Sequence, residues 1–204
     1  MGLFEDAHHE ERKAAGWRSR GYLPHFDGKA VPQFITIHLA DSVPKHVIQG
    51  WKRELRSLEY EQEKIVLQGR IEKYLDQGYG EALLKDFNVA KLVQNSLLKF
   101  DGTRYRLFAW VVMPNHVHLL LWRFENFELK DILHSVKSYT AHEANKLLHR
   151  KGQFWQEDYF DRYMRNQEHF EKTVKYIENN PVKARLCETP SDWPVSSAWL
   201  RNSG

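Results

Sequence analysis

The chain has 204 residues, of which 42% are hydrophobic and 28% charged, a composition that suits one folded domain with extensions. A formal net charge of +3 permits a nucleic-acid partner without requiring one. The single cysteine, Cys187, excludes an internal disulfide framework and any metal site built from several cysteines. The N-terminus is charged, unlike a signal peptide, and no apolar run approaches about 18 residues, so we expect a cytoplasmic protein without a membrane partner.

The first half of the chain predicts one strand followed by a helical insert. Residues 1–30 are polar and then rich in glycine, arginine and aromatic side chains, which indicates an irregular arm. The β-branched and apolar residues 34–40 predict a strand. Asp41 and the early Pro44 then mark a helix start. The charged insert over residues 44–100 is expected to hold helices over 44–75, 81–87 and 89–100.

The second half predicts three further strands and two helices. Two apolar runs flank the turn-type dipeptide Pro114-Asn115 and predict a hairpin-like pair of strands over residues 105–113 and 116–122. An amphipathic helix over 128–149 and a strand over 159–164 follow. A last helix begins at Gln167 and is expected to stop at Pro181.

This order of elements predicts an α+β fold. Strand, helical insert, strand, strand, helix, strand and helix together indicate a ferredoxin-like antiparallel sheet with helices packed on one face. We expect one domain over residues 1–204, with the arm at 1–30, the insert at 44–100 and a turn-rich tail at 181–204.

Two histidines interrupt the second apolar run. Because side chains alternate along a strand, His116 and His118 point to the same face, with α-carbons roughly 6.5–7 Å apart. Two imidazoles at that spacing can converge on one metal ion, and a third ligand must then come from another element. The alternative is a pair of buried structural histidines with hydrogen-bond partners.

Two known classes of His-x-His site fit this chain poorly. The histidine-triad nucleotide hydrolases need a third histidine at the next alternate position, which is Leu120 here. The barrel-type amidohydrolases need about 250 residues for their barrel, more than this chain has.

A longer set of motifs resembles a known family. The string from Trp110 to His118, with His-hydrophobic-His on a central strand, resembles the single-tyrosine HUH endonucleases and transposases. Within that superfamily the chain is most similar to the REP-associated tyrosine transposases. The further segments that carry this resemblance are residues 34–44, 154–162, 176–184 and 192–197.

The resemblance implies a fold and a chemistry. It implies an HUH endonuclease-type sheet and a tyrosine that attacks single-stranded DNA, giving a 5′-phosphotyrosine and a free 3′-hydroxyl. It also implies a Mg²⁺ or Mn²⁺ ion held by the two histidines and by a polar side chain four residues after the tyrosine. The expected partners are single-stranded DNA hairpins.

The choice of tyrosine depends on this resemblance. The residues alone leave four candidates open, namely Tyr139, Tyr159, Tyr163 and Tyr176. Tyr176 is followed at i+4 by Asn180, which stacks the two side chains on one helical face and matches the family pattern. Tyr139 has Glu143 at that position, which could also bind a metal. We therefore predict Tyr176 as the nucleophile, with His116, His118 and Asn180 as metal ligands.

Basic and aromatic side chains are the expected DNA contacts. Basic groups bind phosphates and aromatic rings stack on bases, although each of these residues can equally be solvated surface. The candidates are Arg18, Arg20, Lys137, Tyr139, Arg162, Arg165, Lys172 and Lys183.

The expected function is a metal-dependent transposase that nicks and joins single-stranded DNA at hairpin-forming repeats. The alternative is a domesticated, catalytically inactive hairpin-binding protein. A replication or conjugation initiator with the same chemistry usually carries further domains, for which 204 residues leave no room. The sequence leaves monomer and homodimer open.

Overall fold

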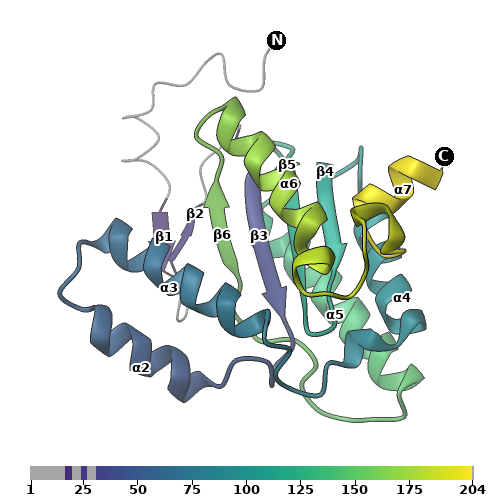
Figure 1. The fold of residues 1–204 in the computed structure, drawn as a ribbon, viewed down its shortest axis with the longest axis horizontal. Coiled ribbons are helices and arrows are strands. Elements are labelled where there is room, and N and C mark those ends of the chain that lie inside the picture. The colour runs from purple at the N-terminus through teal and green to yellow at the C-terminus, as the bar shows by residue number, and fades with distance from the viewer. Residues whose placement is uncertain (1–16, 20–23, 27–30, 204) are drawn as a thin grey trace.

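A four-stranded antiparallel sheet lies at the centre of the molecule (Figure 1). The structure is a computed structural model that describes residues 17–19, 24–26 and 31–203. The sheet order is β4-β5-β3-β6. The first and third strands in chain order, β3 and β5, therefore occupy the middle, as in a ferredoxin-like arrangement. The predicted α+β class is confirmed. The strands are β3 (Gln33–His38), β4 (Tyr105–Val112), β5 (His116–Arg123) and β6 (Phe160–Tyr163).

Helices cover both faces of this sheet, so the expectation of helices on one face was wrong. All six residues of β3 are buried, which is the burial expected of a central strand covered on both sides. One face packs on α4 and α5, and the other on α6 and α3 (Figure 1). The helices are α2 (Lys45–Leu55), α3 (Tyr60–Leu75), α4 (Phe87–Leu98), α5 (Leu129–Leu147), α6 (Gln167–Lys183) and α7 (Ser197–Ser203), with 3₁₀ turns η1 (Leu83–Lys85) and η2 (Pro190–Asp192).

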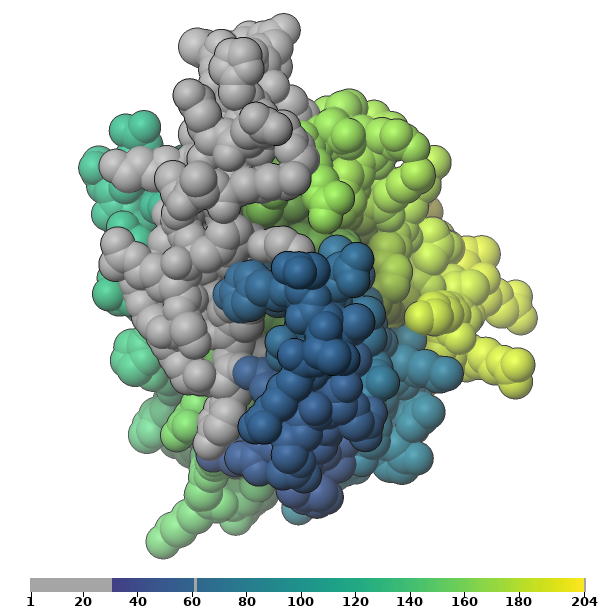
Figure 2. All heavy atoms as spheres, turned by 90° about the vertical axis from the view of Figure 1, so that its left-hand side faces the viewer, coloured from purple at the N-terminus to yellow at the C-terminus, as the bar shows by residue number. Residues whose placement is uncertain are grey.

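The helical insert divides between the two layers. The helix expected over residues 44–75 is two helices, α2 and α3, which share a small apolar core. Phe160 of β6 joins that core and so fastens the two helices to the edge of the sheet. In Figure 2 they occupy much of one face of the molecule, next to the segment that forms α6. The third helix of the insert, α4, instead packs beneath the sheet with α5.

A bulge in β4 helps to position α6. The pairing of β4 with β5 shifts register between Leu107 and Ala109, leaving Phe108 without a paired residue. Leu107 packs in the core beneath α4 and α5, whereas Ala109 packs on the α6 side. The Phe108 ring meets the Phe170 ring of α6 edge-on at 5.0 Å between centroids. This contact anchors the first half of α6 on the sheet.

Helix α6 continues past the proline that was predicted to end it. Pro181 lies inside the helix, which ends at Lys183. Proline has no N–H and withdraws one hydrogen bond from the preceding turn. Because only two helical residues follow, the loss is confined to the last turn, where the Ala184 N–H donates to the Asn180 carbonyl at 3.0 Å. Asn180 therefore keeps a helical position.

The ends of the chain are more ordered than the sequence predicted. The tail forms η2 and α7, and the Trp193 indole N–H donates to the Val112 carbonyl at 2.9 Å. In the arm, β1 (Trp17–Ser19) pairs with β2 (Pro24–Phe26), and the rest of residues 1–30 lies outside the described residues. No helix among the described residues combines the length and apolar character needed to cross a membrane.

Candidate active site

The two histidines meet at the start of β5. His116 and His118 are 1% and 0% exposed, and both side chains lie on the face covered by α6. Their Nε2 atoms are 3.1 Å apart. Burial lowers the pKa of both imidazoles, that of His118 to about 3, and the Lys183 charge lowers both further. Both rings are therefore neutral at physiological pH, which is the form that binds a metal ion.

Asn115 fixes the tautomer of His116. The Asn115 amide nitrogen donates to the Leu75 and Tyr79 carbonyls at 3.1 and 3.2 Å. Its oxygen lies 2.7 Å from His116 Nδ1 and can only accept, so Nδ1 of the neutral ring carries the proton. His116 Nε2 is consequently an acceptor with a lone pair directed at His118. The Asn115 side chain, which comes from the turn between β4 and β5, thus acts as the outer hydrogen-bond partner that orients a candidate metal ligand.

Thr36 plays the equivalent part for His118. Its hydroxyl lies 2.8 Å from His118 Nδ1, across the β3–β5 pair. A hydroxyl can both donate and accept. His118 can therefore donate from Nε2 to His116 in the protein alone, or carry its proton on Nδ1 and present a second Nε2 lone pair to an ion.

Helix α6 brings Tyr176 over this pair. The Tyr176 ring lies 5.4 Å from the His118 ring and 5.9 Å from the Phe34 ring, between centroids. Ile177 is fully buried in the same cluster, with Phe170 and Val174 packed against it. These three residues form the core face of this helix, and Tyr176 lies beside them.

Three buried polar atoms near the histidines are poorly satisfied. The Tyr176 hydroxyl and the two amide atoms of Asn180 make no hydrogen bond of ordinary geometry, and the hydroxyl has only weak contacts with Glu72 and Asn180. Each unsatisfied buried polar group costs about 1–3 kcal/mol. Unsatisfied atoms of this kind are often retained because a ligand or ion uses them.

The helical insert contributes charge to the same site. Burial raises the pKa of the Tyr176 phenol well above its usual value, and the Glu72 and Asp76 carboxylates of α3 raise it further. The pKa of Glu72 is itself raised by burial, against the opposing charge of Arg162. Glu72 also accepts from the Gln68 amide at 2.9 Å. A phenol, a carboxylate and a guanidinium from three separate elements therefore share one partly buried region.

Two of the predicted DNA contacts lie at this site. The Arg162 guanidinium lies 5.7 Å above the Phe34 ring, and its pKa is lowered by burial. Lys183 Nζ lies 5.8 Å from the Tyr176 ring centroid and forms an ion pair with Asp76. Both cations could meet a phosphate beside Tyr176.

The remaining predicted contacts lie elsewhere. Lys172 is exposed on α6 and pairs with Glu168 one turn earlier, at 2.6 Å. Arg165 is exposed, Tyr139 is 54% exposed on α5, and Lys137 of α5 lines a separate cavity. Arg18 lies in β1, with only its backbone position described, and Arg20 lies outside the described residues.

Several residues at the site were missed from the sequence. His38 of β3 pairs across the sheet with His116, and burial lowers its pKa to about 4. Glu72 and Asp76 were missed because they lie in the helical insert, far from Tyr176 in the sequence. Their spacing with Gln68, four residues apart along α3, is the only signal that a polar stripe faces one direction.

The donor set fits a hard or borderline divalent ion. Ligand distances of about 2.1 Å place adjacent ligands of an octahedral ion about 3.0 Å apart, close to the 3.1 Å between the histidine Nε2 atoms. Within the described part of the chain, no three His, Cys, Asp or Glu side chains come together as a metal site. The Asn180 amide oxygen, which makes no hydrogen bond of ordinary geometry, is a donor that could complete such a site.

Comparison with known proteins first gives a class. Residues 88–180 match the family described as "Transposase IS200 like". That span contains the histidine pair, Tyr176 and Asn180. The histidine pair and the tyrosine from the facing helix thus lie within the segment that is similar to this family.

The comparisons then point to particular relatives. A curated REP-associated tyrosine transposase from Escherichia coli strain K12 is 26% identical over 110 residues, which are 52% of this chain and 63% of that relative. A solved REP-associated tyrosine transposase bound to a REP hairpin covers 87% of this chain and 82% of its own, with a TM-score of 0.55 and 18% identity, and so supports the fold. The predicted resemblance is confirmed: the chain is similar in sequence and fold to REP-associated tyrosine transposases.

Proposed function

We propose that this chain is a metal-dependent enzyme that nicks and joins single-stranded DNA at hairpin-forming repeats. Tyr176 is the nucleophile, and His116, His118 and Asn180 hold the ion. The E. coli relative carries the name of a tyrosine transposase, and the solved relative is bound to a REP hairpin. These names supply the class of reaction and the class of DNA.

One observation carries the proposal more than any other. The Tyr176 ring packs against His118 at 5.4 Å, directly beside two Nε2 atoms that face each other at 3.1 Å. The polar atoms of Tyr176 and Asn180 are buried there without a hydrogen bond of ordinary geometry. A site that served only to pack α6 on the sheet would be more stable with apolar side chains at these positions.

The covalent step requires the phenol to lose its proton. The Tyr176 oxygen forms a bond to phosphorus while the bond from phosphorus to the 3′-oxygen breaks. Glu72, whose raised pKa makes it a stronger base than an exposed carboxylate, receives the phenol proton. The departing 3′-oxygen takes a proton from water. In the joining step the same events run in reverse with a new 3′-hydroxyl, and Glu72 returns the proton to Tyr176.

The cations around Tyr176 hold the phosphate in place. Lys183, at the end of α6, lies by the Tyr176 ring, and Arg162 of β6 lies over the neighbouring Phe34 ring and interacts with the Tyr176 charge. Their charges offset the negative charge of the phosphate and of the nearby carboxylates. A bound Mg²⁺ or Mn²⁺ supplies Lewis-acid stabilisation of the charge that develops on the scissile phosphate.

The decisive experiment is a denaturing gel. The protein is mixed with a labelled single-stranded hairpin oligonucleotide drawn from repeats that flank its own gene, in Mn²⁺ or in EDTA. We expect a protein–DNA adduct in Mn²⁺ only, and none with Tyr176→Phe, although that variant still binds the hairpin. Tyr139→Phe is the matched control, because Tyr139 is exposed on α5, and it is expected to form adduct normally.

Two outcomes would contradict the proposal. Adduct formation by Tyr176→Phe would show that another residue is the nucleophile. A shifted band on a native gel without any adduct would instead favour an inactive hairpin-binding protein.

A further inference from the structure

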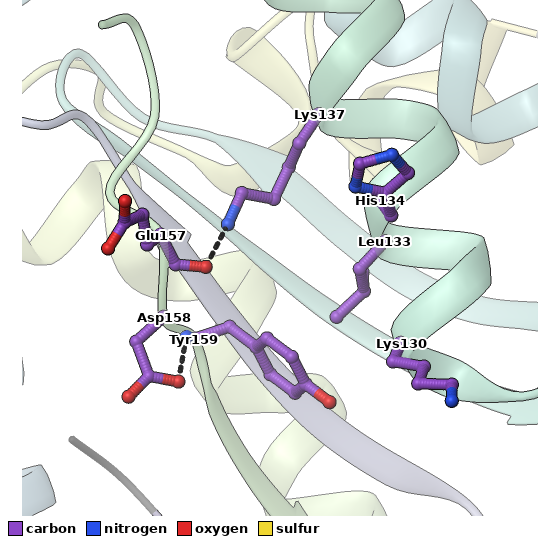
Figure 3. A pocket seen from close by; sticks show the side chains of 7 residues that line it. All are labelled: Lys130, Leu133, His134, Lys137, Glu157, Asp158 and Tyr159. Carbon is purple, nitrogen blue, oxygen red and sulfur yellow. Dashed lines mark hydrogen bonds between the residues drawn. The ribbon is translucent and has the colours of Figure 1, made fainter. Parts of the chain in front are cut away.

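A cavity of about 200 Å³ lies between α5 and the segment that leads into β6. Its floor is apolar and aromatic, made by Leu133 and Tyr159, which are 1% and 8% exposed. Figure 3 shows the Tyr159 ring projecting toward α5. Lys137 reaches across from α5 and donates to the Glu157 backbone carbonyl at 2.7 Å (Figure 3). This contact holds the two walls together at one end of the cavity.

The cavity adjoins the histidine end of the sheet. The Gln156 N–H donates to the His38 carbonyl at 2.9 Å, and His38 is the cross-strand partner of His116. The charges of Lys137 and Asp158 both act on the His38 ring. The cavity therefore lies at the same end of the sheet as the histidine pair but on the α5 side, and a DNA strand that continued around this end of the sheet would reach it.

The cavity is lined by basic, aromatic and apolar side chains, a combination that neither a phosphate nor an apolar ligand would need. Lys130, His134 and Lys137 occupy successive turns of one face of α5, and Glu157 stands at the opposite rim. A site for a phosphate alone would have no use for an aromatic floor. A site for an apolar group would have no use for ammonium groups. A flat ring with hydrogen-bond donors and acceptors on its edge, which is the chemistry of a nucleobase, uses all of them.

We propose that this cavity binds one unpaired base of the single-stranded DNA next to the cleaved phosphate, and so helps to select the cleavage position. The base lies on Leu133 and Tyr159, its edge meets Lys137 and His134, and Lys130 meets its phosphate. The cavity is smaller than the about 300–1,000 Å³ that encloses a drug-sized ligand, so one base is the largest nucleic-acid unit that it accepts. This inference rests on the proposed function, because it requires a DNA strand at the histidine pair.

The test is an abasic scan of the same hairpin oligonucleotide, with binding measured by fluorescence anisotropy at one fixed salt concentration. Each unpaired nucleotide beside the hairpin is replaced in turn by an abasic residue. We expect one position to weaken binding about tenfold, within the range contributed by stacking one base on an aromatic side chain. Lys137→Met should weaken binding to the intact DNA by a similar factor, and should have little further effect on DNA that is abasic at that position.

Two further variants complete the design. If Lys137→Met fails to fold, His134→Ala can replace it, because His134 is exposed at the rim and its loss leaves the Lys137–Glu157 contact in place. Its binding to intact and to abasic DNA is compared in the same way. Lys146→Met is the matched control, because Lys146 is exposed on α5 outside the cavity, and it should act equally on all the DNAs.

Three results would overturn the inference. Adduct formation without any abasic position that weakens binding would overturn this inference and leave the proposed function standing. The same would follow if both cavity variants weakened binding equally for every DNA. Absence of hairpin binding and of adduct would overturn the proposed function together with it.

Discussion

Asn180 is predicted to reduce the stability of the fold that it serves. Both of its amide atoms are buried without a hydrogen bond of ordinary geometry, and the residue is 1% exposed. Leucine has nearly the same branched shape and no polar atoms. We therefore expect Asn180→Leu to raise the free energy of unfolding of the metal-free protein.

The expected gain follows from the cost of burying unsatisfied groups. At about 1–3 kcal/mol for each such group, and with some of the gain lost to imperfect packing, the substitution should stabilise the protein by about 2 kcal/mol. For a chain of this length that corresponds to a rise of about 4–8 °C in the melting temperature. The same variant should lose adduct formation.

The assay is thermal and denaturant unfolding in EDTA, repeated with Mn²⁺. Wild type should gain stability from the ion, by about 2.7 kcal/mol at a hundredfold excess over its Kd, and Asn180→Leu should gain much less. Asn179→Leu is the matched control, since Asn179 is exposed on the next position of α6, and it should shift stability by less than about 0.5 kcal/mol. A loss of stability for Asn180→Leu in EDTA would refute the reasoning, because it would mean that the fold already satisfies the amide.

Two further predictions concern protons. Glu72→Gln should slow adduct formation at neutral pH by about 10²–10⁴-fold, and the rate should recover as the pH rises. Glu63→Gln, on the same helix, should match wild type. A pH–rate profile that Glu72→Gln leaves unchanged would assign the proton to another acceptor. The folded-state pKa values of His38 and His118, about 4 and about 3, lie below the ordinary value, so the unfolded chain alone takes up protons once the pH falls below about 6.5. The free energy of unfolding in EDTA should then fall by up to about 1.4 kcal/mol per pH unit for each histidine, and a flat stability curve between pH 7 and pH 5 would contradict these burial-induced shifts.

Local periodicity accounts for what could be predicted at the site. The alternation of a strand places His116 and His118 on one face, and the i+4 spacing of a helix places Tyr176 above Asn180. The class of fold followed from the order of the strands and helices. These features depend on near neighbours in the chain, and the structure has them as the sequence indicated.

Contacts between distant segments could not be predicted in the same way. Glu72 comes about a hundred residues before Tyr176, and only the packing of α3 beside α6 brings the two together. Nothing in the periodicity of α3 identifies its partner. The coverage of both faces was missed because a continuously apolar strand is compatible with several arrangements of its neighbours. Pro181 was misread because its cost to a helix depends on how much helix follows.

The hydrogen bonds of Asn115 have a consequence for how such proteins can be altered. One amide joins the end of α3 to the ring that is proposed to hold the ion, through the Leu75 and Tyr79 carbonyls on one side and His116 on the other. The insert therefore cannot be exchanged for that of another protein as an independent unit. A transplanted insert must also reproduce two backbone carbonyls at the right place, or the recipient histidine loses its fixed orientation and with it part of its affinity for metal.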